Sequence, residues 1–132
     1  MEQTFVIIKP DGVQRKLIGE IIQRFERKQL KIVQLKIATM SQAQAEEHYA
    51  HVKQYDFFPD LIQYMTSSEV VYMVLKGPNA VQIVRTMIGA TNPVEATPGT
   101  IRGDYGLAGF QNIIHASDSV EAADVEITRF FK

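Results

Sequence analysis

Hydrophobic residues follow two alternating periods along the chain, which predict strands separated by helices. Runs rich in β-branched and aromatic residues predict strands at 4–9, 30–38 and 70–75. The third run, VVYMVL, is continuous, which predicts a strand buried on both faces. The alternation of the second run slips at Ile32 and Val33, which predicts a β-bulge. A short apolar run predicts a fourth strand at 112–116.

Apolar residues at helical spacing predict amphipathic helices between these strands. The stripes are Ile18, Ile21, Ile22 and Phe25; Leu61, Ile62 and Met65; Val81, Val84 and Ile88; and Val120, Ala123, Ile127, Phe130 and Phe131. Ser41 and Gln44 form a capping-box pattern, which predicts a further helix to about residue 52. Boundary signals for the others are Pro59 at one start, Pro78 and Gly89 around the next helix, and Asp118 with Glu121 as caps of the last.

Residues 90–111 break the alternation of predicted strands and helices. The segment ATNPVEATPGTIRGDYGLAGFQ has two prolines, four glycines and little periodicity, which predicts a long loop. A loop this long within a small domain is usually functional or disordered.

The predicted order of elements is β-α-β-α-α-β-α-loop-β-α. Four strands with two right-handed crossovers indicate an α+β fold of the ferredoxin-like, split βαβ type. We expect a four-stranded antiparallel sheet covered by helices on one face, forming a single domain over residues 1–132.

Composition narrows the classes of function. The chain is 45% hydrophobic and 22% charged, with a net charge of −1 and a pI of about 6.3. This balance indicates a globular protein and argues against a broad basic face for nucleic acid. It has no cysteine, which excludes disulfides and thiolate chemistry. No secretory signal or apolar run of about 20 residues is present, so we expect a cytoplasmic protein without a membrane segment.

His115 is the strongest candidate for chemistry, although a lone histidine at a strand end is more often structural. It leaves a predicted buried strand directly before a helix start, where backbone N–H groups attract phosphate-like anions. Glu126, in the same helix, could reach back to orient the ring and free the other nitrogen to attack. Ser117 could support that carboxylate. The simpler alternative for Glu126 is a solvated helix face.

Three cations could cradle a polyphosphate. Lys9 ends the first strand, Arg85 lies in the last turn of a helix, and Arg102 lies in the long loop with Thr91 and PGTIRGD. Arginine binds phosphate oxygens as a fork, whereas lysine supplies a point charge. Each residue alone has an ordinary structural explanation. The loop is not a Walker A sequence, and no GxGxxG follows the first strand.

The aromatic segment YDFFPDL at 55–61 could provide a ring for base stacking, although core anchoring is the simpler alternative. An RNA-recognition module would need basic and aromatic residues interleaved on a central strand. VVYMVL and NIIHAS do not supply them, which disfavours that reading.

Three segments together resemble the nucleoside diphosphate kinases: FVIIKPDGVQRKLIGEIIQRFERK, GATNPVEATPGTIRGDY and NIIHASDSVEAADVEITRFF. The likeness runs in register over nearly the whole chain. It implies transfer of the γ-phosphoryl group of a nucleoside triphosphate to a nucleoside diphosphate, by a ping-pong route through phosphohistidine. It also implies a ferredoxin-like core, Mg²⁺ carried by the nucleotide, and broad tolerance of the base.

The resemblance assigns roles residue by residue. His115 would be the nucleophile, with Glu126 and Ser117 as its supporting groups. The phosphates and the histidine would be surrounded by Lys9, Tyr49, Arg85, Thr91 and Arg102. Asn112, with Lys9, would contact the sugar hydroxyls, while Phe57 would stack on the base and Leu61 would line the same cleft. No protein side chain is expected to bind the metal.

Several positions depart from the family pattern. Ala116 stands where glycine is common, so the backbone there should suit an L-residue. Gly109 replaces an aliphatic residue beside the base, and Gln29 replaces a glycine between helix and strand. The chain ends at Lys132, without the tail that packs on neighbouring subunits in many members. We expect a homo-oligomer, a tetramer or hexamer built from dimers, with the loop around Pro93 contributing contacts.

Two other functions remain as alternatives. The first is a regulatory nucleotide-binding protein that has lost turnover, but it would be expected to lack His115, Lys9 or Arg102. The second is a nucleic-acid-binding module on a ferredoxin-like fold, which the charge balance disfavours.

Overall fold

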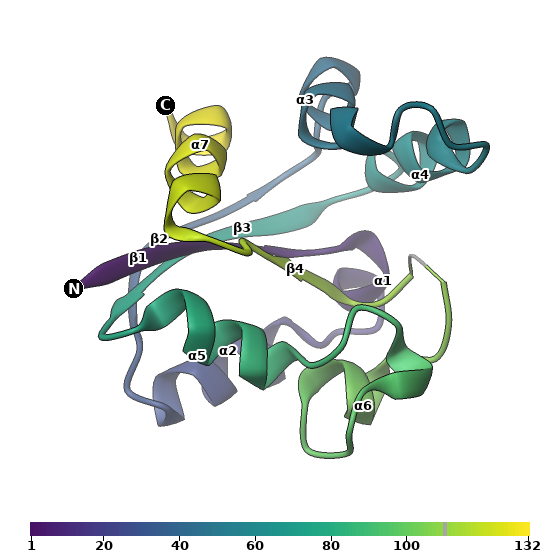
Figure 1. Cartoon of the computed structure of the whole chain (residues 1–132). Helices are drawn as coiled ribbons and strands as arrows, with labels where there is room; N and C mark the ends of the chain where they lie inside the picture. The colour runs from purple at the N-terminus through teal and green to yellow at the C-terminus, as the bar shows by residue number, and fades with distance from the viewer. Residues whose placement is uncertain (110) are drawn as a thin grey trace.

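The computed structural model describes residues 1–109 and 111–132, shown as a cartoon in Figure 1. The strands are β1 (Glu2–Ile8), β2 (Lys31–Ala38), β3 (Val70–Gly77) and β4 (Ile114–Ala116). The helices are α1 (Pro10–Gln14), α2 (Ile18–Arg27), α3 (Gln42–His48), α4 (Phe58–Met65), α5 (Ala80–Ile88), α6 (Ile101–Tyr105) and α7 (Val120–Phe131), with 3₁₀ turns η1 (Ala50–Val52) and η2 (Pro93–Glu95).

The four strands form one sheet in the order β2-β3-β1-β4, with all three pairings antiparallel. This arrangement confirms the predicted ferredoxin-like α+β fold. The β2–β3 register shifts between Ile32 and Gln34, which places the predicted bulge at Val33. On the other side of β1, His115 of β4 lies opposite Ile7. The central strand therefore fixes the position of the histidine.

Helices cover both faces of the sheet, and the prediction that they cover one face was wrong. Figure 1 shows α3, α4 and α7 on one side and α2, α5 and α6 on the other. Val6 and Ile8 pack in the cluster that includes α2 and α5, whereas Phe5 and Ile7 pack in the cluster that includes α3, α4 and α7. The physical reason is that β1 and β3 are apolar at nearly every position, so both faces must be shielded from water.

Two local predictions also need correction. The cap of α7 is Ser119, whose side chain accepts from the Ala122 amide, rather than Asp118 with Glu121. The long loop is partly ordered, because it contains η2 and α6. Helix α6 is capped by Thr100, whose hydroxyl accepts from the Gly103 amide. A Cβ at Gly103 would lie 1.9 Å from the Thr97 carbonyl oxygen, so only glycine permits this close turn.

Helix α2 ends in a Schellman motif centred on Gln29. The Gln29 amide donates to the Glu26 carbonyl, and the Leu30 amide donates to the Phe25 carbonyl. Gln29 takes φ 70°, in the left-handed region that favours glycine. No helix in the described part of the chain is both long and apolar enough to cross a membrane.

Replacing Gln29 with glycine should therefore stabilise the fold. The left-handed conformation costs an L-residue about 1–2 kcal/mol, and the greater freedom of glycine in the unfolded chain returns part of that gain. We expect the free energy of unfolding in urea to rise by about 0.5–1 kcal/mol. The adjacent Lys28, at φ −77°, provides the control, because Lys28→Gly should destabilise the protein. A Gln29→Gly protein no more stable than Lys28→Gly would contradict this account.

Candidate active site

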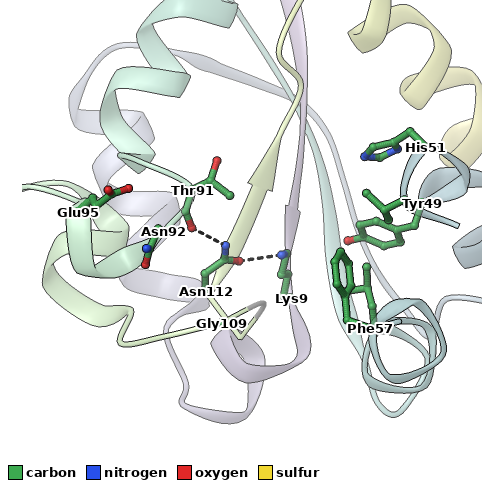
Figure 2. Close-up of a pocket in the computed structure, with 11 residues that line it drawn as sticks. Lys9, Tyr49, His51, Phe57, Thr91, Asn92, Glu95, Gly109 and Asn112 are labelled. Atoms are coloured by element: carbon green, nitrogen blue, oxygen red, sulfur yellow. Dashed lines mark hydrogen bonds between the residues drawn. The ribbon is translucent and has the colours of Figure 1, made fainter. Parts of the chain in front are cut away.

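A cavity of about 710 Å³ opens beside the ends of β1 and β4, within the size range of small-molecule sites. Six of the predicted site residues line it: Lys9, Tyr49, Phe57, Leu61, Thr91 and Asn112. Gly109, which was expected beside the base, also lines it, and four further lining residues were not predicted: His51, Val52, Asn92 and Glu95. Figure 2 shows Thr91, Asn92 and Glu95 on one wall, and Tyr49 and Phe57 on the other.

A chain of hydrogen bonds runs along the floor of the cavity, from Thr91 on one wall through Asn112 to Lys9 (Figure 2). Lys9 Nζ donates to Asn112 Oδ1 over 2.7 Å, and Asn112 Nδ2 donates to the Thr91 carbonyl over 2.9 Å. Lys9 and Asn112 are buried, whereas Thr91 is exposed. The lysine and the amide are therefore fixed in place, and a bound molecule would meet a preformed polar floor.

The other two predicted cations, Arg102 and Arg85, donate hydrogen bonds to backbone carbonyl oxygens. Arg102 is buried and donates to three carbonyl oxygens, those of Gly89, Asn112 and Ile114, at 3.0, 3.4 and 2.6 Å. Arg85 donates to the Ala116 carbonyl over 3.2 Å. The two arginines thus hold both ends of the segment that carries His115, a structural role that the sequence did not reveal.

Burial and neighbouring positive charges lower the pKa values of Lys9 and Arg102. Burial, with a contribution from Arg102, lowers the pKa of Lys9 to about 7, although Asp11 partly opposes the shift. Burial and Arg85 lower the pKa of Arg102 to about 10. Like charges held together in this way disfavour their own ionised forms, and an anion among them would relieve the repulsion. The cluster is therefore electrostatically suited to phosphate.

His115 is held by Glu126 from helix α7. Its Nε2 lies 3.1 Å from Glu126 Oε1, and the same oxygen accepts from Ser117 Oγ over 2.5 Å. Burial raises the pKa of Glu126, but the hydrogen bonds from His115 and Ser117 outweigh it, so the pKa is lowered overall. An ionised carboxylate can only accept, so Nε2 of His115 carries the proton and Nδ1 keeps its lone pair. The three residues that the sequence grouped together do meet.

The backbone before His115 turns sharply at Ile113. Its φ is 77°, which is strained for a β-branched residue, and the Ile114 amide donates to the Asn112 carbonyl over 2.9 Å, closing a γ-turn. Asp11 Oδ2 accepts from the Ile113 amide over 3.0 Å, and Tyr64 donates to Asp11. This turn was not predictable from the sequence, because isoleucine rarely takes positive φ.

Behind Glu126 lies His48, which the sequence did not single out. Its ring centroid is 4.7 Å from that of His115, and its Nδ1 lies 3.0 Å from Arg129 Nη1. Burial lowers the pKa of His48 to about 2, with further contributions from His115 and Arg129, so the ring is neutral. No spacing in the sequence indicated this contact, because His48 and Arg129 lie 81 residues apart.

His48, His115 and Glu126 form the one group of three potential ligands that the described residues bring within 4.8 Å. This nitrogen-rich set does not suit Mg²⁺, which prefers oxygen ligands. Its donor atoms are, moreover, already hydrogen-bonded to Ser117, Arg129 and each other. The residues present fit a metal held by phosphate oxygens better than one held by side chains.

The departures from the family pattern have different consequences. Ala116 ends β4 and is not among the residues with positive φ, so alanine is unstrained there, as expected. Gly109, at φ 68°, lines the cavity, and a Cβ there would meet nothing within 4 Å. Phe57 is 43% exposed, with its ring stacked on that of Tyr55 at 5.5 Å, while Leu61 is buried. Aromatic side chains thus form one wall of the cavity, whereas at Gly109 the lining is backbone alone.

Comparisons with known proteins all indicate one family. A family model described as nucleoside diphosphate kinase matches residues 2–132. A nucleoside diphosphate kinase of Archaeoglobus fulgidus is 56% identical over 99% of this chain and 87% of that protein. The crystal structure of the Encephalitozoon cuniculi nucleoside diphosphate kinase superposes with a TM-score of 0.97, at 46% identity over 99% of this chain and 89% of that one. A Halobacterium salinarum nucleoside diphosphate kinase in complex with CDP gives 0.96, at 47% identity over 99% and 88%.

The buried charge of Lys9 predicts a pH-dependent effect on stability. The lysine has an ordinary pKa of 10.5 when unfolded and about 7 when folded. Between these values the unfolded chain binds more protons, so the folded state gains stability as pH rises through this window. Lys9→Gln keeps a donor for Asn112 but removes the charge. It should raise the free energy of unfolding by about 1–2 kcal/mol near pH 6.5, and by less toward pH 10.

Urea unfolding over this pH range measures the difference between Lys9→Gln and the unaltered protein. Lys53→Gln, at an exposed lysine, is the matched control and should give no such trend. A difference for Lys9→Gln that stayed constant with pH would rule out the buried charge as its cause.

Proposed function

The chain belongs to the nucleoside diphosphate kinase family, and on that premise we propose that it works by a ping-pong route through phosphohistidine at His115. Family membership makes it a phosphotransferase acting between nucleoside triphosphates and nucleoside diphosphates. The observation that carries the finer proposal is the contact of His115 Nε2 with the ionised Glu126, which leaves Nδ1 as the nucleophile.

In the first half-reaction, the lone pair of His115 Nδ1 attacks the γ-phosphorus. A P–N bond forms as the bond to the β–γ bridging oxygen breaks, and the electron pair leaves with the nucleoside diphosphate. Positive charge that develops on the ring is stabilised by Glu126, which Ser117 holds in place. In the second half-reaction, a terminal phosphate oxygen of the acceptor attacks the phosphorus, and the P–N bond breaks.

The phosphates would lie among Lys9, Arg85, Arg102, Thr91 and Tyr49. Phosphoryl transfer depends mainly on positioning and charge stabilisation, which a preformed cation cluster supplies. The Tyr49 hydroxyl is buried and has no hydrogen-bond partner among the described residues, which supports a role in contacting a ligand. Burial and Glu126 raise the pKa of Tyr49, so its phenol stays protonated and can donate.

The nucleoside would occupy the outer part of the cavity. Phe57 would stack on the base beside Leu61, while Asn112 and Lys9 would contact the sugar hydroxyls. An exposed ring suits any base, because every base has a π-face. The complex of the Halobacterium salinarum relative with CDP is consistent with a nucleotide in this cavity. We therefore propose broad tolerance of the base.

A divalent cation, Mg²⁺, would arrive with the nucleotide and be held by its phosphate oxygens. It would neutralise charge on the phosphates during transfer. Lys9, Arg85 and Arg102 would orient the phosphates around it. The regulatory alternative is disfavoured, because every residue needed for turnover is present. Neither the net charge nor the sheet composition favours a nucleic-acid site.

We also propose a homo-oligomer built from dimers, joined through the edge strand β2. Leu35 and Ile37 are 50% and 57% exposed and lie opposite Met73 and Val71, so they share one face. An apolar edge strand with unpaired backbone groups is a surface for a second chain of the same kind. Whether dimers form a tetramer or a hexamer is left open.

His115→Ala should abolish phosphotransfer but leave nucleotide binding and the fold largely intact, because it removes only the nucleophile. The measurement is intact mass after brief incubation with Mg·ATP and no acceptor, quenched at alkaline pH. One phosphoryl group should appear on the unaltered protein, disappear on adding a nucleoside diphosphate, and be absent from the variant. A folded, ATP-binding protein without this adduct would instead favour the regulatory alternative.

Glu126→Gln should slow turnover far less than His115→Ala, because it removes orientation and charge rather than the nucleophile. We expect kcat to fall by about 10- to 100-fold, the effect of losing one charged hydrogen bond. Steady-state rates for both variants test this, and equal losses would contradict the division of roles.

Leu35→Glu should weaken the oligomer by placing a charge at the centre of the proposed contact. Size-exclusion chromatography with light scattering, over a range of protein concentrations, measures the mass. Val125→Glu is the matched control, since Val125 is similarly exposed, at 56%, but lies on α7. If both variants kept the mass of the unaltered protein, β2 would not be the contact.

A further inference from the structure

We infer that Arg129 is a positioning residue for the phosphohistidine reaction, acting through His48 to keep Glu126 on His115. The inference rests on the proposed function but concerns residues to which the proposed reaction assigns no role. Arg129 lies on α7 three residues after Glu126, so both side chains leave the same face of the helix. Its Nη1 lies 3.0 Å from His48 Nδ1.

This contact fixes the state of His48. A guanidinium can only donate hydrogen bonds, so Nδ1 of His48 must accept, and the neutral ring carries its proton on Nε2. The ring is buried, and its side chain is 2% exposed. Glu47 Oε1 lies 3.5 Å from Arg129 Nε, an ion pair without a hydrogen bond. The arginine therefore holds His48 in one tautomer.

The position of His48 makes that tautomer important. His48 Nδ1 lies 3.9 Å from Glu126 Oε2, while Glu126 Oε1 accepts from His115. Without Arg129, Nδ1 could take a proton and pair with Glu126. The carboxylate would then be drawn from the nucleophile toward a second imidazolium, and His115 would lose the partner that orients it.

The charges around His48 come from every side. They are His115 on β4, Glu126 and Arg129 on α7, His51 on η1, and Lys9 at the end of β1. Arg129 and Lys9 oppose protonation of His48, whereas Glu126 favours it. Burial of the ring opposes protonation most, and Arg129 is the permanent charge in direct contact with the ring.

The experiment compares the rate of phosphohistidine formation from Mg·ATP in the unaltered protein, Arg129→Leu, and Arg129→Leu combined with His48→Gln. Arg129→Leu should react within about twofold of the unaltered protein near pH 8.5 and increasingly more slowly as the pH is lowered, by about fivefold or more at the lowest pH at which both proteins stay folded, because loss of the guanidinium lets His48 take up a proton at a higher pH than before. The double variant has no group to titrate at this position, so the pH dependence of the unaltered protein should return. Arg129→Lys, which keeps a charged donor, should retain most of the rate at both pH values.

A purely structural role predicts a different pattern. Loss of packing would slow Arg129→Leu by the same factor at every pH, and the second substitution would not restore the rate; that result would overturn the inference. So would a pH profile unchanged from the unaltered protein.

Titration of the His48 ring nitrogens by ¹⁵N NMR, without nucleotide, separates the two hypotheses. The neutral ring with Nε2–H should persist to low pH in the unaltered protein, while His48 of Arg129→Leu should take up a second proton at a higher pH. If no phosphohistidine formed in any variant, the proposed function would fail while this titration still tested the role of Arg129. If both proteins titrated alike, the inference alone would fail.

Discussion

The burial of β1 on both faces is the constraint on which the rest of the structure depends. Its apolar residues require helices above and below the sheet, and its two hydrogen-bonded edges are occupied by β3 and β4. Lys9 follows the end of this strand directly, and its amide donates to the Ile113 carbonyl over 2.8 Å. The lysine and the histidine strand are therefore fixed to a buried central strand. Helix α7 packs back on β1, which brings Glu126 to His115 across eleven residues of sequence.

The same anchoring holds the positively charged side chains of Lys9, Arg85 and Arg102 close together. Burial, together with Arg102, lowers the pKa of Lys9, and burial, together with Arg85, lowers the pKa of Arg102, so holding these cations costs the fold stability. Backbone carbonyls accept hydrogen bonds from both arginines and hold them in place. Stability is thus exchanged for a site that is ready before the ligand arrives.

Local chemistry made much of this fold predictable from sequence. The Ser41–Gln44 capping box, the bulge at Val33 and the end of α5 at Gly89 follow from nearby residues alone, and each is present. Tertiary context decided what was missed. Whether helices cover one face of the sheet or both depends on the packing of the whole chain. The positive φ of Ile113 runs against residue preference and exists because Asp11, far away in sequence, accepts from its amide.

In the candidate site, too, local groupings were predictable and long-range contacts were not. His115, Glu126 and Ser117 could be grouped because they lie within one strand–helix unit, and six predicted residues do line the cavity. His48 and Arg129 meet across α3 and α7, so no spacing along the chain indicates that they pair. The backbone bonds of Arg102 were equally hidden, because they depend on the path of the loop.

Strand β4 spans only three residues and pairs on one edge, yet it carries the nucleophile. Much of its anchorage comes from side chains: Arg102 and Arg85 hold carbonyl oxygens of this segment, and Asp11 holds the Ile113 amide. Arg102 and Arg85, which are proposed to bind phosphate, thus also hold the strand in place. Local opening of this segment would release the nucleophile and its phosphate cradle together. During heating, individual molecules should therefore pass from fully active to inactive without a weakened intermediate, and amide exchange along β4 should report the same event.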